Sequence, residues 1–430
     1  MRMKVLVLGP GGREHAIIRA LLADPQVQEV HSAPGNAGIS QDVPVHQIDA
    51  NNPEAAVSLA QDLGVDLVVI GPEAPLVAGV ADALRAKDIN VFGPNQDAAA
   101  LEGSKAFAKE IMAAADVPTA LAYVATNADE AIKALDTFGA PYVVKDDGLA
   151  AGKGVVVTED RAAAIAHAEA CFEAGGSVVI EEYLDGPEVS LFVLSDGTNV
   201  VPLAPAQDFK RIFDGDEGPN TGGMGAYSPL EWLPAGFVEE VVERVARPTI
   251  GEMARRGTPF NGVLFCGLAV TKRGIRVIEF NARFGDPETQ AVLSRLKSPL
   301  GQLLLAAARG KLDVQGELEW DSRTALDVVM AAKNYPDTPQ KGDVISGLQE
   351  ANELKNVHVI HAGTAEKDGE IITAGGRVLA VVALGGTLTE ARQAAYAGVQ
   401  KISWDSAQYR SDIAQAAAEN KIRVPDTSSH

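Results

Sequence analysis

Two segments of the sequence combine glycine with charged residues in patterns suited to phosphate chemistry. The first is Val143–Val157, in which Lys145 ends an apolar run and Lys153 lies in a loop of small residues. Two strands joined by such a loop form a lid whose lysines and amides close over phosphates. The loop is not a Walker A loop, because no Gly-Lys-Ser/Thr sequence ends it. The alternative is an ordinary glycine-rich hairpin with two solvated lysines.

The second segment is Arg276–Glu288, which begins as an apolar strand and ends in a polar turn. Alternate residues of a strand share one face, so Ile278 and Phe280 are predicted to point into a core. The opposite face then carries three polar side chains: Glu279, Asn281 and Arg283. Two oxygen ligands beside a cation suit a Mg²⁺ ion bound together with phosphates. The alternative is the solvated polar face of an edge strand.

A glycine-rich turn, Gly9–Gly12, follows the first apolar run of the chain. Such a turn, leading into a helix, presents free backbone amides to an anion. Glu14 stands where the dinucleotide-binding fingerprint requires glycine, so the turn does not indicate NAD binding. A tight strand–helix connection without a ligand is an equally good interpretation.

The loop Gly218–Pro229 is rich in glycine and closely follows the pair Lys210-Arg211. This combination is suited to wrapping a small anionic substrate. A long flexible loop is the alternative, although the low charge of the segment is not typical of disorder.

Upstream, the apolar strand Val178–Glu182 runs into the turn Asp185–Pro187, which suits a hinge whose backbone groups could bind an adenine.

The elements that must position these segments begin with an alternating pattern over the first hundred residues. Short apolar runs and amphipathic stretches alternate there, which predicts a parallel, doubly wound sheet. The expected strands are Val5–Leu8, Glu29–Ser32, Asp66–Ile70 and Asn90–Phe92. The expected helices are Glu14–Leu22, Pro53–Asp62 and Val77–Ala86, followed by an alanine-rich helical region over Gln96–Ala115.

The rest of the chain divides into a compact unit, a larger body and a strand-rich end. Residues 118–188 contain four apparent strands interleaved with two helices, which we expect to form a small lid. After Trp320 the sequence becomes strand-rich and punctuated by glycine. We therefore predict an N-terminal domain over 1–101, a central domain over 102–322 that includes the lid, and a C-terminal domain over 323–430.

Composition limits the classes of partner. The formal net charge of −21 argues against nucleic acid, because phosphate neutralisation needs a basic surface. Apolar runs such as Val378–Leu384 are strand-sized and far shorter than the roughly 20 residues of a membrane helix. Two cysteines cannot make a disulfide framework or a zinc site, so a reducing, cytoplasmic setting is expected.

Taken in order, these segments resemble the phosphoribosylamine–glycine ligases, a family of the ATP-grasp superfamily. The resemblance runs nearly end to end and includes the motifs Gly11–His15, Pro34–Gly38, Gly71–Leu76, Gly103–Lys105, Asp147–Val155, Gly218–Pro229, Glu279–Glu288 and Tyr409–Ile413. It implies an α/β, ATP-grasp fold with an N-terminal doubly wound parallel-sheet domain and a strand-rich C-terminal domain. It also implies ATP-dependent ligation of glycine to 5-phosphoribosylamine through glycyl phosphate, as in purine biosynthesis, with Mg²⁺ or Mn²⁺ bound.

Matching positions imply the residue roles. ATP phosphates would contact Lys105, Lys145 and Lys153, with adenine against Glu181, Glu182 and Leu184 and the ribose against Glu188. The metal ion would be held by Glu279 and Asn281. The candidates for glycine, the acyl phosphate and phosphoribosylamine are Arg283, Asp286, Asp208 and Lys210, with further substrate contacts from Gly12, Arg13, Glu14, Asn220, Gly222 and Gly223. The implied partners are these small molecules, without nucleic acid or membrane, for a monomer or homodimer.

The sequence departs from the family pattern at three positions. Asp146 replaces a small residue, while Phe209 and Phe213 replace a more usual histidine and glycine. These changes affect the surroundings of Lys145 and of the loop that follows Asp208. Two alternatives remain open: another ATP-grasp carboxylate–amine ligase or carboxylase, and a nucleotide-binding protein without catalytic activity.

Overall fold

A four-stranded parallel sheet forms the N-terminal part of the protein in the computed structural model, which describes residues 2–149 and 154–426. The strand order is β2-β1-β3-β4, with bounds β1 Met3–Gly9, β2 Val27–Pro34, β3 Leu67–Ile70 and β4 Val91–Phe92. Its helices are α1 Gly12–Leu22, α2 Ile39–Asp42, α3 Pro53–Leu63, α4 Glu73–Val77 and α5 Val80–Arg85. The predicted doubly wound parallel sheet is confirmed. No helix of the described residues is long and apolar enough to cross a membrane.

The helical region predicted over Gln96–Ala115 is two helices, α6 Gln96–Gly103 and α7 Lys105–Ala114. Ser104 separates them with extended backbone, and its side chain accepts a hydrogen bond from the Phe107 amide. A serine in this position caps the second helix. The break therefore places Lys105 in the first turn of α7.

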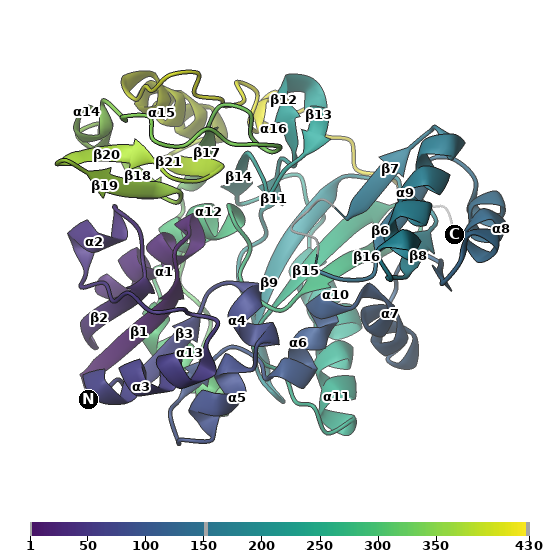
Figure 1. Cartoon of the computed structure of the whole chain (residues 1–430), viewed down its shortest axis with the longest axis horizontal. Coiled ribbons are helices and arrows are strands. Elements are labelled where there is room, and N and C mark those ends of the chain that lie inside the picture. The colour runs from purple at the N-terminus through teal and green to yellow at the C-terminus, as the bar shows by residue number, and fades with distance from the viewer. Residues whose placement is uncertain (1, 150–153, 427–430) are drawn as a thin grey trace.

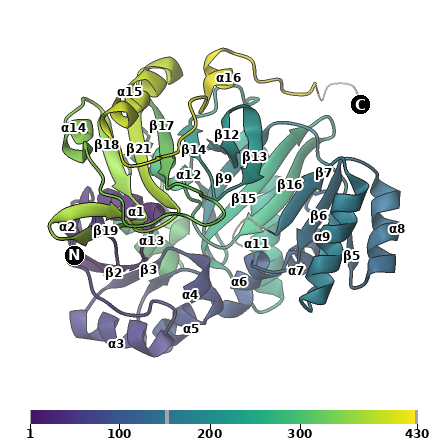
Figure 2. The ribbon, with the colours of Figure 1, turned by 45° about the horizontal axis from the view of Figure 1, so that its top comes forward.

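The lid is an antiparallel sheet in the order β5-β8-β6-β7. Its strands are β5 Ala122–Ala125, β6 Tyr142–Asp146, β7 Val155–Thr158 and β8 Val178–Glu181, and its helices are α8 Ala128–Phe138 and α9 Arg161–Glu173. A small core of its own holds the lid together, with Val144, Ile180 and Leu135 fully buried. In both Figure 1 and Figure 2 the lid lies at the opposite end of the molecule from the C-terminal sheet.

The central sheet is antiparallel and has the order β10-β9-β15-β16. Its strands are β9 Glu188–Asp196, β10 Val200–Pro202, β15 Asn261–Thr271 and β16 Gly274–Asn281. The accompanying helices are α10 Phe237–Val241, a π-helical turn Val242–Ala246, α11 Arg247–Arg255, α12 Glu288–Arg295 and α13 Leu300–Ala308, with a 3₁₀ turn at Leu312–Val314.

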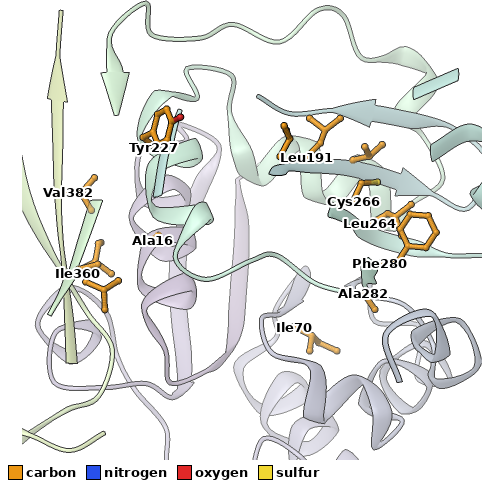
Figure 3. Packing of buried hydrophobic residues seen from close by; sticks show 14 of the residues in the cluster. Ala16, Ile70, Leu191, Tyr227, Leu264, Cys266, Phe280, Ala282, Ile360 and Val382 are labelled. Atoms are coloured by element: carbon orange, nitrogen blue, oxygen red, sulfur yellow. The ribbon is translucent and has the colours of Figure 1, made fainter. Parts of the chain in front are cut away.

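Strand β16 contains a bulge at Ile278. Successive residues of β15 pair with Glu279 and Val277, so Ile278 is left out of the register. One extra residue shifts the side-chain alternation, and Val277 and Phe280 therefore both join the core. Ile278 is only half-buried and lies outside that core cluster, so the prediction that it shares the core face is wrong. Phe280 was predicted correctly and lies beside Leu264 and Cys266 in Figure 3.

The C-terminal sheet takes two of its strands from the middle of the chain. Its order is β11-β14-β17-β21-β18, with bounds β11 Gln207–Asp208, β14 Gly225–Ser228, β17 Thr324–Ala331, β18 Val357–His361 and β21 Arg377–Gly385. Two hairpins flank it, β12 Arg211–Phe213 with β13 Glu217–Asn220 around the 3₁₀ turn Asp214–Asp216, and β19 Thr364–Lys367 with β20 Glu370–Thr373. The remaining helices are α14 Leu348–Asn352, α15 Leu388–Lys401 and α16 Gln415–Ala418.

One hydrophobic core runs through all three predicted domains outside the lid. The same cluster contains Ile70 of the N-terminal sheet, Leu191 of the central sheet and Val382 of the C-terminal sheet. Figure 3 shows these side chains with Tyr227 of β14, which pairs with Leu326 of β17. The C-terminal sheet is thus continuous with the central region in both hydrogen bonding and packing.

This continuity predicts the behaviour of a fragment. A chain ending at residue 322 would lose β17, leaving the inner edge of β14 and the apolar side chains beneath it unpaired. We expect this fragment to aggregate or to lack a cooperative unfolding transition, as measured by size-exclusion chromatography and thermal circular dichroism. A matched truncation after residue 420 removes only the terminal segment and is expected to unfold like the whole chain. A monodisperse, cooperatively unfolding 1–322 fragment would contradict this prediction.

Candidate active site

The carboxylate of Glu279, at the end of β16, lies among cations from four different segments. Four side chains act on it electrostatically: Lys210, Lys145, Arg283 and Lys105. Burial alone would raise the pKa of Glu279, but these cations outweigh burial and hold the pKa below its ordinary value. The structure therefore brings together residues that the sequence placed in one site although they span nearly two hundred positions.

The metal site was predicted at Glu279 and Asn281, which are two residues apart on β16 and both half-buried. They offer one carboxylate and one amide, both with oxygen donors. Within residues 2–149 and 154–426, no group of three or more His, Cys, Asp or Glu side chains is arranged to hold a metal ion. Mg²⁺ favours a few protein oxygens completed by water and substrate phosphates, and these two residues fit such an ion.

Lys145 and Glu181 form a buried ion pair where strands β6 and β8 of the lid meet the central sheet. The Lys145 Nζ lies 2.9 Å from Glu181 Oε2 and donates to the Ile278 carbonyl at 2.9 Å. The other oxygen of Glu181 lies 3.1 Å from Lys109 Nζ. The residue predicted to contact phosphate and a residue predicted to contact adenine are therefore joined directly. Both are almost fully buried, at 4% and 3% exposure.

The other predicted nucleotide contacts lie around this pair. Lys105 donates from Nζ to the Gly148 carbonyl at 2.9 Å, so the first turn of α7 touches the loop that follows β6. Glu182 accepts the Leu121 amide at 3.0 Å and pairs with Arg273 at 2.8 Å, which ties the two chain segments entering the lid. Leu184 is half-buried in the connection to β9. Lys153 lies outside the described residues.

Asp208, Lys210 and Glu188 form a second charged group where the start of β9 in the central sheet meets β11 of the C-terminal sheet. Lys210 Nζ lies 2.9 Å from Glu188 Oε2. Glu188 is the main reason that the pKa of Lys210 is well above its ordinary value. Burial raises the pKa of Asp208, and the nearby Lys210 offsets part of this shift. The predicted ribose contact and two predicted catalytic residues are therefore neighbours.

Arg283 and Asp286 hold the turn after β16 through two separate networks. Arg283 Nη2 lies 2.9 Å from Glu102 Oε1, and its Nε lies 3.5 Å from Glu73 Oε2. Asp286 Oδ2 accepts the Arg13 amide at 3.2 Å. Through these contacts the turn is fastened to α4, to α6 and to the glycine-rich turn before α1.

Glu14 holds the N-terminal turn internally. Its carboxylate, fully buried, accepts the Gly11 amide at 2.9 Å and two hydrogen bonds from the Arg13 guanidinium at 3.0 and 2.9 Å. A Cβ added to Gly71 would overlap this carboxylate, so glycine is required for the close approach. The other two predicted substrate residues of this turn, Gly12 and Arg13, are also buried, and the Arg13 amide donates a hydrogen bond to Asp286.

Sequence reasoning missed Tyr335 and Arg377, which contact the loop Gly218–Pro229 from the C-terminal part of the chain. The Gly222 amide donates to Tyr335 Oη at 2.9 Å. Arg377 Nη1 donates to the Asp286 carbonyl at 2.7 Å and approaches the Gly223 carbonyl at 3.5 Å. We call Tyr335 and Arg377 the clamp. Neither of the two lies in a motif quoted above, and more than a hundred positions separate them from the loop. Asn220, the last residue of β13, lies just before the loop residues that the clamp contacts and is half-buried.

Two buried acids near the clamp were also missed as site residues. Glu288 begins α12 and is 3% exposed; burial and the neighbouring Asp208 raise its pKa to about 8. Asp327 of β17 is fully buried, and within the described residues neither carboxylate oxygen has a hydrogen bond of normal geometry. Burial, Asp286 and Glu288 raise the pKa of Asp327 well above its ordinary value, and the nearby Ala226 amide offsets only part of this.

Two of the three departures from the family pattern adjoin cations of this site in sequence, Asp146 beside Lys145 and Phe209 beside Lys210, but their side chains contact other residues. Asp146 alternates with Lys145 along β6 and acts on the thiol of Cys171, on the opposite side from Glu181. Phe209 packs against Tyr227, and the Arg410 guanidinium lies over its ring at 5.2 Å. Phe213 is 54% exposed in the β12–β13 hairpin.

Family models of phosphoribosylglycinamide synthetase match the chain in three parts. The N domain matches residues 3–102, the ATP-grasp (A) domain residues 103–289 and the C domain residues 325–416. A phosphoribosylamine–glycine ligase of Streptomyces coelicolor is 61% identical over 97% of this chain and 100% of its own length. The chain belongs to the phosphoribosylamine–glycine ligase family. A Rhizobium meliloti member is 48% identical over 96% of this chain and 98% of its own.

Solved structures of this ligase family and of other ATP-grasp proteins share the fold. The crystal structure of phosphoribosylamine–glycine ligase from Thermotoga maritima has 35% identity and a TM-score of 0.82, covering 95% of this chain and all of that one. The biotin carboxylase domain of a Hydrogenobacter thermophilus 2-oxoglutarate carboxylase has 17% identity and a TM-score of 0.73, covering 95% and 92%. The second similarity concerns the fold alone.

The contacts of Arg377 predict that changing this residue lowers the activity of the ligase, although Arg377 lies outside the ATP-grasp domain. Arg377→Ala removes the guanidinium that holds the Asp286 carbonyl and Gly223. Because small misplacements of a substrate-binding group are costly, we expect kcat/KM for the two ligated substrates to fall about 10- to 100-fold. Steady-state kinetics would measure this fall, with the exposed Arg309→Ala as the matched control. Equal kinetics for the two variants would remove Arg377 from the site.

The raised pKa of Glu288 predicts a pH-dependent stability. Between the ordinary pKa of about 4.5 and about 8, the folded chain binds one more proton than the unfolded chain, so stability falls as pH rises. Glu288→Gln removes this loss, and we expect its stability relative to wild type to increase from pH 5 to pH 8 by at most ~4 kcal/mol. Denaturant unfolding at both pH values measures the difference, with the exposed Glu217→Gln as control. A difference between Glu288→Gln and wild type that stays constant with pH would refute the assignment.

Proposed function

We propose that this chain joins glycine to 5-phosphoribosylamine, with ATP split to ADP and phosphate, in purine biosynthesis. The observation that carries the proposal is the group of four cations that act on Glu279, because such a group is suited to an anionic, metal-linked triphosphate. Family membership over the whole chain supports the choice of these two substrates. The Thermotoga maritima structure, which shares both the fold and 35% identity, supports the same choice.

In the first step, a carboxylate oxygen of glycine attacks the γ-phosphorus of ATP, and the bond to the ADP oxygen breaks. Phosphoryl transfer depends mainly on positioning and charge neutralisation. In our proposal Lys105, Lys145 and Lys153 bind the phosphates, while Arg283 neutralises charge that develops on the transferred group. A divalent ion, Mg²⁺ or Mn²⁺, would be held by Glu279 and Asn281 and would neutralise the phosphate oxygens when bound.

In the second step, the amine of phosphoribosylamine attacks the carbonyl carbon of glycyl phosphate, and inorganic phosphate leaves. The attacking nitrogen must lose a proton when the C–N bond forms. Asp208 and Asp286 are the carboxylates that we assign to the amine-bearing substrates, with Lys210 orienting the acyl phosphate. The turn Gly12–Glu14 and the loop residues Asn220, Gly222 and Gly223 would enclose the sugar phosphate with backbone amides.

The nucleotide would lie between the lid and the central sheet. Adenine would contact Glu181, Glu182 and Leu184, and the ribose would contact Glu188. The pair Lys145–Glu181 links the phosphate and adenine ends of this site, since both residues bind the same boundary between lid and body. When Lys145 contacts a phosphate, Glu181 keeps its ion pair with Lys109. The buried carboxylate of Glu181 therefore always has a cationic partner.

The proposed substrates and setting follow the charge distribution. A chain with a net charge of −21 binds small phosphorylated molecules through a local group of cations, without attracting nucleic acid. We propose a cytoplasmic enzyme that acts as a monomer or homodimer. Another ATP-grasp ligase or carboxylase is the second candidate, because biotin carboxylase domains share the fold at low identity.

The test is the substrate dependence of ADP release. We expect release that requires glycine and phosphoribosylamine together, and formation of glycine hydroxamate from glycine, ATP and hydroxylamine. Release with bicarbonate or formate but not with glycine would replace this assignment by the second candidate. Binding of ATP without any acceptor-dependent release would indicate a protein without catalytic activity.

The metal residues provide the matched variant. Glu279→Gln combined with Asn281→Ala is expected to lower kcat by at least about 10³-fold, because the charge of the transferring phosphate is no longer neutralised. Far-UV circular dichroism should remain unchanged. The exposed pair of changes Glu217→Gln and Asn51→Ala serves as control with the same chemistry. Near-normal turnover of the double variant would exclude these two residues from the metal site.

A further inference from the structure

A polar pocket lies beside the segment that connects α7 to the lid, outside the residues assigned to the ligation reaction. Its volume is about 410 Å³. One wall is the connecting segment Ala115–Pro118, and the opposite wall comes from the π-helical turn and the start of α11, through Glu243, Arg244 and Pro248. Arg276 of β16 completes the lining.

Arg276 is the unusual residue of this pocket. Its Nε atom is buried and has no hydrogen-bonding partner, and no carboxylate of the described residues forms an ion pair with its guanidinium. The side chain of Arg276 is half-buried, and its Nε is the atom shielded from solvent. A buried donor without a partner is costly, so native structures rarely retain one without a ligand, an ion or a water. The guanidinium therefore offers donors that the described protein groups do not use.

The charges around Arg276 favour an anion. Burial lowers the pKa of Arg276, the charges of Arg273 and Arg244 lower it further, and Glu182 offsets part of this shift. Of these two arginines, Arg244 also lines the pocket. Two of the nearby carboxylates are already engaged, since Glu182 pairs with Arg273 at 2.8 Å and Glu243 pairs with Arg247 at 3.1 Å. Asp116, the remaining acid of the lining, is exposed to solvent.

The local backbone explains how the arginines are brought together. Arg244 is carried on a π-helical turn, and Pro248 follows in the first turn of α11, where it removes one backbone donor. Turns of this kind occur frequently at functional sites. Arg276 is fixed from the other side, because the Val277 amide donates to the Pro118 carbonyl at 2.8 Å and Thr119 Oγ1 donates to the Val277 carbonyl at 2.6 Å.

We propose that this pocket is a second anion site, which binds inorganic phosphate or a phosphate monoester through Arg276 with Arg244 beside it. Guanidinium groups match phosphate through paired hydrogen bonds, and a binding anion would supply the missing partner of Arg276. The site is independent of the proposed ligation, since no residue of its lining is assigned to ATP, glycine or phosphoribosylamine.

The pocket touches the connection between lid and body. Pro118 and Thr119 are hydrogen-bonded to β16, and Lys109 holds the next residue by donating to the Ala120 carbonyl at 3.1 Å. An anion between Arg276 and the connecting segment would contact both the fixed strand and the start of the lid. Anion binding at this pocket can be measured directly, without measuring turnover.

The experiment measures binding of inorganic phosphate to the whole chain by isothermal titration calorimetry, with the nucleotide site saturated by Mg·ATP and without glycine or phosphoribosylamine, so that the γ-phosphate position is already filled. We expect saturable binding in wild type and at least a tenfold weaker affinity in Arg276→Gln. The exposed Arg309→Gln is the matched control and should bind phosphate like wild type. Saturable binding that is unchanged in Arg276→Gln, or no saturable binding in wild type, would overturn the proposal.

A folding defect is excluded by a second variant and a second measurement. Arg244→Gln changes an exposed arginine paired with Glu240, so it is expected to fold normally and to weaken phosphate binding about threefold or more. Far-UV circular dichroism and kcat should match wild type in both arginine variants. Normal phosphate affinity in both single variants, Arg244→Gln and Arg276→Gln, would also contradict the proposed site. Loss of ligation in wild type would concern the proposed function alone, because phosphate binding is measured separately.

Discussion

The structure of the site depends on keeping the half-buried carboxylate of Glu279 ionised. Burial opposes ionisation, and the combined action of Lys210, Lys145, Arg283 and Lys105 outweighs it. These cations lie in four segments: the connection after β11, the end of β6, the turn after β16 and the first turn of α7. Each segment must therefore be held in place by the fold, because displacement of any one cation would favour the protonated acid.

Several features of the fold serve this arrangement. The break at Ser104 brings Lys105 to the first turn of α7, where an unbroken helix would carry it elsewhere. The bulge at Ile278 places Glu279 and Asn281 on the face opposite the core, while Phe280 and Ala282 fill that core. Ion pairs of Arg283 with Glu102 and Glu73 fasten the following turn to the N-terminal half.

Much of this could be predicted from local patterns, and the remainder depends on distant contacts. Alternation of apolar runs predicts the parallel sheet because its period is local, and short motifs identify Glu279 and Lys145 because neighbouring residues carry the signal. The bulge breaks the period of two without any glycine to mark it, so Ile278 was assigned to the wrong face. Arg377 and Asp327 reach the site from another domain through pairing of β14 with β17, which no local pattern specifies.

The buried acids give the site a second, opposite electrostatic character. Glu279 is stabilised as an anion by cations, whereas Asp327 and Glu288 lie where burial and neighbouring carboxylates favour the protonated form. Arg377 lies beside Asp286, between these acids and the glycine-rich loop. A chain with a net charge of −21 thus gathers cations around Glu279, while burial favours the neutral form of the adjacent acids Glu288 and Asp327. Since neutral acids repel phosphate much less than carboxylates do, protonated Asp327 and Glu288 oppose a phosphate in this region less than two ionised acids would.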